Sequence, residues 1–340
     1  MNTADVGLDV VAASANPRPE DVVVVVPALN EAAFIEACLA SLTEGDPFMT
    51  GVRIIVADGG STDGTRDIVR SLASTRPDLQ LIENPARLQS AGINRAVADA
   101  TEPRHRYLVR CDAHAVYPEG YVRRVAEALA ARPEAASVAS VLDAVGDGCF
   151  QRASAWVVDT PLGSGGSAHR GGGTSGWIDH GHHAGFRLDW FRKVGGYDAS
   201  FGHNEDAEYD HRLGRAGGRV WLAADLRTDY MVRPTAQSLW RQYWNYGRGR
   251  ARTILKHRMR PRLRQLIPVA NLLAIVAAIL VALLWIPALI LPGLYLLALA
   301  LVSLVGATRI GPCGLLAGPV LLIMHNAWAI GFLRQMADRS

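Results

Sequence analysis

Acidic and basic side chains are missing from two long stretches in the last quarter of this 340-residue chain. No Asp, Glu, Lys or Arg occurs at positions 265–308 or 310–333. Because a helix rises about 1.5 Å per residue, roughly 20 apolar residues cross the ~30 Å hydrocarbon layer of a bilayer. We therefore predict a transmembrane region over 265–340, with three spans at about 266–284, 286–306 and 313–333. A buried helical hairpin is the alternative interpretation.

The features of a secretion signal and a CxxC motif are also missing. The first residues include Asp5 and Asp9 but neither a basic start nor a long apolar run, so we expect a disordered tail over 1–20 and a following domain in the cytoplasm. The four cysteines form no CxxC pair, and a reducing compartment favours free thiols at all of them. With a mean hydropathy of +0.11, the chain as a whole is too apolar to be disordered.

Excess positive charge is confined to one segment. Residues 1–247 carry 24 Lys and Arg against 31 Asp and Glu, whereas 248–264 carry eight basic residues and no acid. This distribution argues against nucleic acid as a partner. A basic belt directly before the first span places it, and the domain before it, on the cytoplasmic side of the inner (plasma) membrane. Anionic lipids are the expected partners of the belt.

Short β-branched runs alternate with helical segments from position 22 onward, as in VVVVV at 22–26 and RIIVA at 53–57. This alternation predicts an α/β domain over 21–235 with a mostly parallel sheet covered on both faces. Such sheets bind ligands beyond the carboxyl ends of their strands. Four polar clusters occupy those positions and are expected to meet at one edge, at 27–31, 58–63, 84–94 and 110–114. Taken singly, the polar residues of the first two clusters could instead cap helices.

Two nucleotide-binding motifs are absent, since no GxGxxG follows the first strand and no GxxxxGK[ST] occurs. A nucleotide would need another cradle. Asp112 and His114 in RCDAHAVYP are two residues apart at the end of a strand, so both side chains can face the same divalent ion. Two protein ligands leave positions open, which suits Mg²⁺ or Mn²⁺ completed by diphosphate oxygens and water. A structural hydrogen-bonded pair is the alternative.

Nine segments between about 22 and 258 carry a family likeness: VPALNE, VADGGSTDGTRDIV, ENPARLQSAGINRAV, RCDAHAVYP, PLGSGGSAHRGG, IDHGHHAGFR, VGGYD, NEDAEYDHRL and RQYWNYGRGRART. In this order they resemble the family 2 glycosyltransferases, which have the GT-A fold, a Rossmann-like architecture with a mostly parallel sheet. The likeness is greatest to the branch of the family that serves succinoglycan biosynthesis.

The resemblance implies roles for the residues at the strand ends. It implies that a nucleotide sugar, with a UDP-sugar as first choice, is bound by Pro27, Asn30, Glu31, Asp58, Gln89, Asn94 and Asp112. The metal motif of the family is usually DxD and here reads DxH, which implies Mn²⁺ or Mg²⁺ at Asp112 and His114. The common DDGS reads DGGS here, so the second carboxylate of that motif is missing.

The resemblance aligns Glu205 and Asp206 with the acidic pair that supplies the general base in inverting members of the family. A sugar hydroxyl is a poor nucleophile, so a carboxylate must take its proton as it attacks the anomeric carbon. We assign Asp206 as the base and expect Glu205 to orient or bind the acceptor. Glu208 and Asp210 are expected only to stabilise the first turn of a helix.

Two further segments are implied to serve the acceptor or to form a lid. IDHGHHAGFR would line the acceptor side, with His183 or its neighbour near the sugar. A zinc site there is disfavoured because consecutive side chains of an extended segment point to opposite faces. The glycine-rich stretch 161–173, with Gly165 and Gly166, is either a surface loop or a lid over the donor.

The region 236–264 combines aromatic and basic residues and predicts an amphipathic helix lying on the membrane surface. Processive synthases carry QxxRW here, but Gln242 is followed by Asn245 and Tyr246, which argues against processive synthesis. The arginines of this region, among them Arg248, would meet phosphate, either of lipid headgroups or of the acceptor's own diphosphate.

These implications together predict a metal-dependent, inverting hexosyltransferase anchored in the membrane. It would transfer glucose from UDP-glucose to a polyprenyl-diphosphate-linked saccharide in exopolysaccharide or cell-wall glycan assembly. Three alternatives remain open: a transferase that uses polyprenyl phosphate itself, a processive polysaccharide synthase, and an inactive membrane scaffold.

Overall fold

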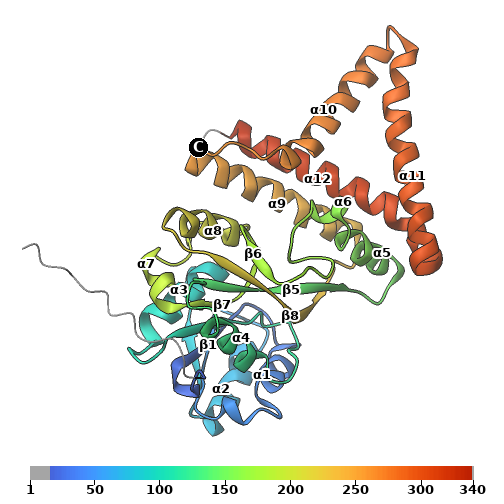
Figure 1. Ribbon diagram of the computed structural model, residues 1–340. Helices are drawn as coiled ribbons and strands as arrows, with labels where there is room; N and C mark the ends of the chain where they lie inside the picture. Colours follow the sequence, from blue (N-terminus) through green and yellow to red (C-terminus); the bar gives the residue numbers. More distant parts are fainter. Residues whose placement is uncertain (1–15, 339–340) are drawn as a thin grey trace, which may run out of the picture.

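The computed structural model describes residues 16–338 (Figure 1). Most of the expected N-terminal tail lies outside the described residues. At the junction of the expected tail and the domain, Pro19–Asp21 forms a 3-10 turn, η1, that leads directly into the first strand. Asp21 is buried there and accepts a hydrogen bond from the backbone N–H of Arg18.

A single eight-stranded sheet, in the order β3-β2-β1-β4-β7-β5-β8-β6, forms the centre of the domain that precedes the C-terminal helices. The half formed by β3, β2, β1 and β4 is parallel, as predicted. The other half is mixed, because β7 and β6 run antiparallel to their neighbours while β5 and β8 pair in parallel. The strands are β1 (Val22–Ala28), β2 (Arg53–Asp58), β3 (Leu79–Glu83), β4 (Tyr107–Arg110), β5 (Ser137–Val145), β6 (Gly176–Ile178), β7 (His182–Arg187) and β8 (Val220–Met231).

Helices cover both faces of the sheet, which explains the unbroken valine run of β1. Val22, Val24 and Val26 pack in one core with α1 (Ile35–Thr43), α2 (Thr65–Thr75) and α4 (Tyr121–Ala130). Val23 and Val25 pack in a second core with α3 (Gln89–Ala100), α7 (Leu188–Lys193) and α8 (Glu205–Arg215). Because successive strand residues point to opposite faces, a strand covered on both sides needs an apolar residue at every position.

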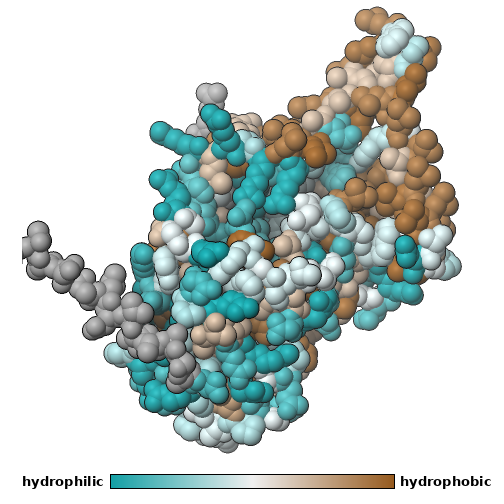
Figure 2. All heavy atoms as spheres, in the orientation of Figure 1, coloured by the Kyte–Doolittle hydropathy of each residue, from teal (hydrophilic) through white to brown (hydrophobic). Residues whose placement is uncertain are grey.

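The C-terminal part of the chain is helical and consists of a projecting helical hairpin and a pair of helices packed side by side. The helices are α9 (Ala236–His257), α10 (Leu263–Ala282), α11 (Ile290–Ile310) and α12 (Ala317–Ala337), with the 3-10 turns η3 (Ile286–Leu289) and η4 (Gly311–Leu316) between the last three. In Figure 1, α10 and α11 form a hairpin that projects away from the domain, while α12 lies along α9. The projecting hairpin is covered with hydrophobic residues (Figure 2), and Leu284 at its tip is 96% exposed.

The expectation of three separate spans is met only in part. By length and composition, the described residues contain two helical segments apolar enough to cross a membrane, Leu263–Ala282 and Ile286–Ala337. The last helix, α12, packs closely on α9: a Cβ at Gly247 would collide with the backbone of Trp328, and one at Gly331 with the backbone of Trp244. Helix α12 is therefore shielded on one side by α9, unlike the exposed hairpin.

The expectation that all four cysteines are free thiols is wrong for two of them. Cys149, the first residue of α5 (Cys149–Val158), forms a disulfide with Cys313 of η4, with 4.8 Å between their Cα atoms. Cys38 and Cys111 are free and buried. The sequence could not indicate this pairing, because 164 positions separate the partners and only the packing of α5 against the C-terminal helices brings them together.

Candidate active site

The loops that follow β1 and β2 are held together by polar contacts. Asp58, the last residue of β2, is buried and accepts backbone N–H groups from Gly60 at 2.9 Å and Ser61 at 3.1 Å. Gly60 has a φ of +82°, which glycine adopts without strain. Asn30 donates its N–H to the Ser61 hydroxyl and accepts the N–H of Thr62 through Oδ1. The first two predicted polar clusters therefore form one rigid corner.

A pocket of about 140 Å³ opens beside this corner at the carboxyl edge of the parallel strands. Its wall combines three of the four predicted polar clusters: Pro27, Ala28, Leu29, Glu31, Asn84, Arg87, Leu88, Gln89, Asp112, Ala113 and His114. A larger hollow, of about 640 Å³, lies where β2 and β3 begin and is lined by residues such as Arg53 and Asp78. That hollow is at the opposite end of the strands from the clustered acids.

Arg110, the last residue of β4, joins the pocket to the start of α8. Its side chain is only 5% exposed, and its Nη1 donates to Oδ1 of Asp206 at 2.8 Å. Its Nε lies 3.6 Å from Oδ1 of Asp112, which also accepts the amide of Gln89 at 3.1 Å. A single guanidinium therefore links the carboxylate of the pocket, Asp112, to the predicted base, Asp206.

The two carboxylates beside Arg110 are held in their ionised form. Burial alone would raise the pKa of Asp206, but Arg110, nearby histidines and a hydrogen bond from Tyr197 outweigh burial and lower that pKa. The pKa of Asp112 is likewise lowered, because Arg110 and His182 outweigh the effect of burial. Both donors to Asp206, Arg110 and the Tyr197 hydroxyl at 2.7 Å, reach Oδ1. The other oxygen, Oδ2, is left to take a proton.

Glu205 has the opposite electrostatic environment although it is the next residue along the chain. Burial and the neighbouring negative charge of Asp206 raise the pKa of Glu205 to about 7. Both acids stand in the first turn of α8, where the helix dipole favours negative charge. The pair thus combines one carboxylate that is ionised at neutral pH with one that is partly protonated.

A comparison with sequence profiles of protein families shows which family the chain belongs to. Residues 23–195 match the sequence profile described as glycosyl transferase family 2. The chain belongs to this family.

One relative of this family 2 glycosyltransferase covers nearly the whole chain, and a second covers about two thirds of it. The chain is 43% identical over 318 residues to the succinoglycan biosynthesis protein ExoA of Rhizobium meliloti (strain 1021). The aligned part covers 93% of this chain and 94% of that protein. The predicted resemblance to that branch is thereby confirmed. A second relative is the dolichyl N-acetyl-alpha-D-glucosaminyl phosphate 3-beta-D-2,3-diacetamido-2,3-dideoxy-beta-D-glucuronosyltransferase of Methanococcus voltae, 21% identical over 242 residues, 68% of this chain and 74% of that protein.

A solved structure shares the fold of this glycosyltransferase, including the C-terminal helices. The mannosyltransferase PcManGT from Pyrobaculum calidifontis, in complex with GDP-Man and Mn²⁺, superimposes with a TM-score of 0.67 at 22% identity. The match covers 95% of this chain and 90% of that one. The GT-A fold is therefore confirmed for this glycosyltransferase.

The residues predicted to hold a metal line the same pocket but are not fully free. Oδ2 of Asp112 lies 3.4 Å from Nε2 of His182, and Nδ1 of His114 lies 3.3 Å from a carboxylate oxygen of Glu31. Within the described residues no group of three or more His, Cys, Asp or Glu side chains is arranged to hold a metal ion. The ionised Asp112 and the exposed His114 are nevertheless suitable donors for an open site whose other ligands come from the substrate.

Of the two histidines considered for the acceptor side, the structure places His182 beside the pocket and His183 in the core. His183 is fully buried, 2.8 Å from Asp210, and packs against the rings of Phe186 and Tyr209 in the core. His182 points the other way, toward Asp112. The alternation of side chains along β7 sends one histidine into the core and the other into the site.

Several other predicted site residues have structural contacts instead. Asn94 is not at the pocket; it exchanges two hydrogen bonds with the backbone of Tyr197. Gln242 donates to the hydroxyls of Tyr230 and Tyr246, and Arg248 donates to Gln335 of α12. Gly165 and Gly166 both accept hydrogen bonds through their carbonyl oxygens from Arg264, at the start of α10. The glycine-rich loop is thus attached to the first apolar helix.

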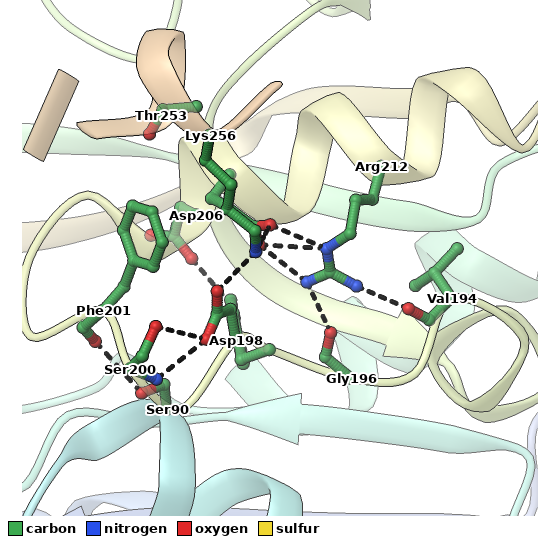
Figure 3. A network of polar contacts seen from close by, with 12 residues as sticks. Ser90, Val194, Gly196, Asp198, Ser200, Phe201, Asp206, Arg212, Thr253 and Lys256 are labelled. Carbon is green, nitrogen blue, oxygen red and sulfur yellow. Dashed lines mark hydrogen bonds and ion pairs between the residues drawn. The ribbon is translucent and has the colours of Figure 1, made fainter. Parts of the chain in front are cut away.

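Glu208 and Asp210 do more than stabilise a helix turn. Glu208 is completely buried and binds Arg212 on its own helix and Lys256 and His257 on α9. Lys256 also pairs with Asp198, and Arg212 reaches the carbonyls of Val194 and Gly196 (Figure 3). This network fixes α9 across the N-terminal half of α8, next to the acid pair.

Two residues near the acid pair, Tyr197 and His169, were not singled out from the sequence, and Arg110 was named only as the first residue of the cluster 110–114. A signal for Arg110 exists, since it stands two residues before Asp112 and so shares its side of the strand. Tyr197 has no comparable signal, because its hydroxyl reaches Asp206 only through tertiary packing. His169 is half-buried, its Nδ1 has no hydrogen-bond partner among the residues that the structure describes, and desolvation together with His180 and Arg170 lowers its pKa.

Proposed function

We propose that this glycosyltransferase transfers a hexose, with inversion, from a nucleotide sugar to a lipid-linked saccharide in exopolysaccharide or cell-wall glycan assembly. Glucose from UDP-glucose is the donor we propose first. The observation that carries the proposal is the position of Arg110 between Asp112 in the pocket and Asp206 at the start of α8. The proposed donor site and the proposed base would then lie on either side of one guanidinium.

The comparisons support the proposed substrate classes. The relative with 43% identity is a succinoglycan biosynthesis protein, and the Methanococcus voltae relative is, by its name, a transferase acting on a dolichyl phosphate-linked sugar. The structural neighbour holds GDP-Man and Mn²⁺. The name of the Methanococcus voltae relative supports a lipid-linked acceptor, and the complex of the structural neighbour supports a nucleotide sugar donor and a divalent metal.

The donor would occupy the pocket at the strand ends. We assign binding of the nucleotide to Pro27, Asn30, Glu31, Asp58 and Gln89, which line the pocket or hold its corner in place. The pocket volume of about 140 Å³ is below the ~300–1,000 Å³ usual for a small-molecule site. Only part of the nucleotide sugar would be enclosed there, and the remainder would extend toward Asp206.

A divalent ion, Mn²⁺ or Mg²⁺, would be held by Asp112 and His114. When bound, the ion would supply positive charge that stabilises the leaving diphosphate. Arg110 keeps Asp112 ionised, as a ligand of such an ion must be. Glu31, which pairs with His114, holds the imidazole at the wall of the pocket.

Asp206 would act as the base in a single displacement. The acceptor hydroxyl oxygen forms a bond to the anomeric carbon as the bond from that carbon to the donor diphosphate breaks, and the hydroxyl proton passes to Oδ2 of Asp206. Glu205, with its raised pKa, would donate a hydrogen bond from its protonated carboxyl to an acceptor oxygen and so orient the nucleophile. Single displacement converts an α-linked donor into a β-linked product.

The α10–α11 hairpin would anchor the enzyme in the inner membrane, with the catalytic domain in the cytoplasm and the basic belt on anionic lipids. Its exposed leucines and the clustered charge of 248–264 support this placement. We also propose that the C-terminal region crosses the membrane more than once.

The decisive test is to incubate membranes containing the enzyme with each labelled nucleotide sugar and to extract the lipid products. We expect label in a lipid-linked saccharide with UDP-glucose, and none with the Asp206→Asn variant. Product on added polyprenyl phosphate alone would favour a monosaccharide transferase. A ladder of chain lengths would favour a processive synthase, and no product with any donor would favour a scaffold.

A further inference from the structure

The hydroxyl of Tyr197 takes part in the contact between Arg110 and Asp206. It accepts a hydrogen bond from Nη1 of Arg110 at 3.2 Å and donates to Oδ1 of Asp206 at 2.7 Å. Nη1 of Arg110 also donates directly to Oδ1 of Asp206 at 2.8 Å. Hydrogen bonds to a charged group are roughly twice as strong as those between neutral groups. Rotation of the Asp206 carboxylate therefore requires that two strong hydrogen bonds break.

The side chain of Asn94, in α3, holds the main chain of Tyr197 through both of its polar groups. Nδ2 of Asn94 donates to the carbonyl oxygen of Tyr197 at 2.7 Å, and Oδ1 accepts the backbone N–H at 2.8 Å. Gly196 allows this close approach, because its φ is +66° and a Cβ there would lie 2.4 Å from Oδ1 of Asn94. Arg212 of α8 donates to the carbonyl of Gly196 (Figure 3). The turn before α8 is thereby fixed to two helices.

The ring of Tyr197 is enclosed by other aromatic rings. Tyr197 is 2% exposed, and its ring centroid lies 5.9 Å from that of Phe186, 5.7 Å from Phe191 and 5.2 Å from Tyr209. Tyr209 is also buried, but its hydroxyl has no hydrogen-bond partner among the residues that the structure describes. Of these two neighbouring tyrosines, Tyr197 is the one whose hydroxyl contacts Asp206.

We propose that Tyr197 is a positioning residue for the base and that Asn94 acts through it. Asn94 fixes the main chain, the aromatic rings fix the side chain, and the hydroxyl fixes Oδ1 of Asp206, so that Oδ2 is available to the acceptor hydroxyl. A base must lie within hydrogen-bond reach of the proton that it removes. This inference rests on the proposed function, in which Asp206 is the base. It gives Asn94 a role in holding the base instead of the nucleotide contact expected from the sequence.

The first test compares Tyr197→Phe with Tyr209→Phe in the full-length enzyme. Each variant removes one hydroxyl from the same aromatic cluster, and only Tyr197→Phe removes a hydrogen bond to Asp206. We expect Tyr197→Phe to lower kcat for glucose transfer from UDP-glucose about tenfold to a hundredfold, with KM for UDP-glucose and Kd for UDP unchanged. Tyr209→Phe should behave as the wild type does. Equal kcat values for the two variants would overturn the proposal.

Asn94 is tested by separating kcat from nucleotide affinity. A residue that contacts the nucleotide would weaken UDP binding when replaced, whereas a residue that positions the base would lower kcat alone. We expect Asn94→Ala to lower kcat and to leave the Kd for UDP, measured by calorimetry with Mn²⁺, unchanged. Asn94→Asp, which keeps the acceptor for the backbone N–H but loses the donor, should show a smaller loss. Weaker UDP binding with unchanged kcat in either variant would refute the assignment of Asn94.

The pH profile separates positioning from a general loss of packing. The charged and titratable neighbours of Asp206, besides Tyr197, are Arg110 of β4, His182 and His183 of β7, Glu205 and His169. Burial raises the pKa of Asp206, but Arg110, the two histidines of β7 and the Tyr197 hydrogen bond outweigh burial and lower it. A carboxylate base loses activity as pH falls through its pKa. The acid limb should therefore move to higher pH in Tyr197→Phe and stay in place in Tyr209→Phe; an unmoved limb in both would contradict the proposal.

A thermal measurement tests the same hydrogen bond without turnover. Tyr197→Phe should lower the Tm of the wild type, and it should lower the Tm clearly less in an Asp206→Ala background, where the hydroxyl has no carboxylate to donate to. Tyr209→Phe should have the same effect in both backgrounds. An equal effect of Tyr197→Phe in both backgrounds would overturn the proposal whether or not sugar transfer is seen. Absent transfer in the wild type, with the dependence on Asp206 intact, would contradict the proposed function alone.

Discussion

Arg110 at the end of β4 and Asp206 in the first turn of α8 form an enclosed ion pair, with Nη1 and Oδ1 2.8 Å apart. The pair connects two elements 96 positions apart in the chain. Asp112, on the other side of the same guanidinium, belongs to the pocket. The charge state of the proposed base and the position of the proposed metal ligand therefore depend on one arginine.

Replacing Arg110 by alanine should impair both stability and activity. The buried carboxylate of Asp206 would lose its main charge partner, and breaking a buried pair in this way costs about 3–5 kcal/mol. Chemical denaturation of the solubilised enzyme would measure this loss. The double variant Arg110→Ala with Asp206→Asn should recover part of the stability, since the unpaired charge is removed. Equal stability of the two variants would show that the ion pair is not the cause.

The pH dependence of transfer should separate the roles of the two acids. With the pKa of Glu205 near 7, its protonated fraction falls as pH rises through neutrality. If the protonated form donates a hydrogen bond to the acceptor, activity declines above about pH 7. Glu205→Gln, which cannot lose its proton, should remove this decline and keep substantial activity. An increase of activity through pH 7 that disappears in Glu205→Gln would instead make Glu205 the base.

Asp112→Ala should weaken donor binding only where a divalent ion is present. The variant removes a carboxylate that is ionised at neutral pH, so the nucleotide sugar would lose its bridge to the protein through the ion. Calorimetric titration with UDP, with Mn²⁺ and with chelator, would measure the effect. In the wild type we expect chelator to weaken binding; in Asp112→Ala the chelator should make little further difference. Binding of wild-type enzyme that is indifferent to the ion would contradict the metal assignment.

The two adjacent histidines of β7 should behave differently when replaced. His183→Ala removes a buried partner of Asp210 and should destabilise the fold by about 3–5 kcal/mol. His182→Ala removes a contact of Asp112 at the edge of the site and should lower activity while changing stability by less than about 1 kcal/mol. Thermal unfolding and transfer rates measured on both variants test this contrast. Similar unfolding temperatures for the two would contradict the placement of His183 in the core.

The alternating pattern of the first half of the domain made its parallel sheet predictable. Valine at every position from 22 to 26 indicates burial on both faces, and the polar residues after each strand then have to share one edge. The meeting of Asn30, Asp58 and Ser61 at one corner could be predicted in this way. The second half was not, because nothing in the composition of 182–187 reveals that this strand inserts antiparallel between β4 and β5.

The sequence by itself determined the parallel half of the sheet and the presence of an apolar C-terminal region, because local periodicity and long uncharged runs depend on neighbours in the chain. The family was indicated by the resemblance of its motifs. Only the tertiary structure decided which histidine faces the site, that Cys149 meets Cys313, that α12 packs on α9, and that Arg110 joins Asp112 to Asp206. Each of these depends on contacts between residues distant in the chain. Such contacts are set by how helices and strands pack, which no local pattern records.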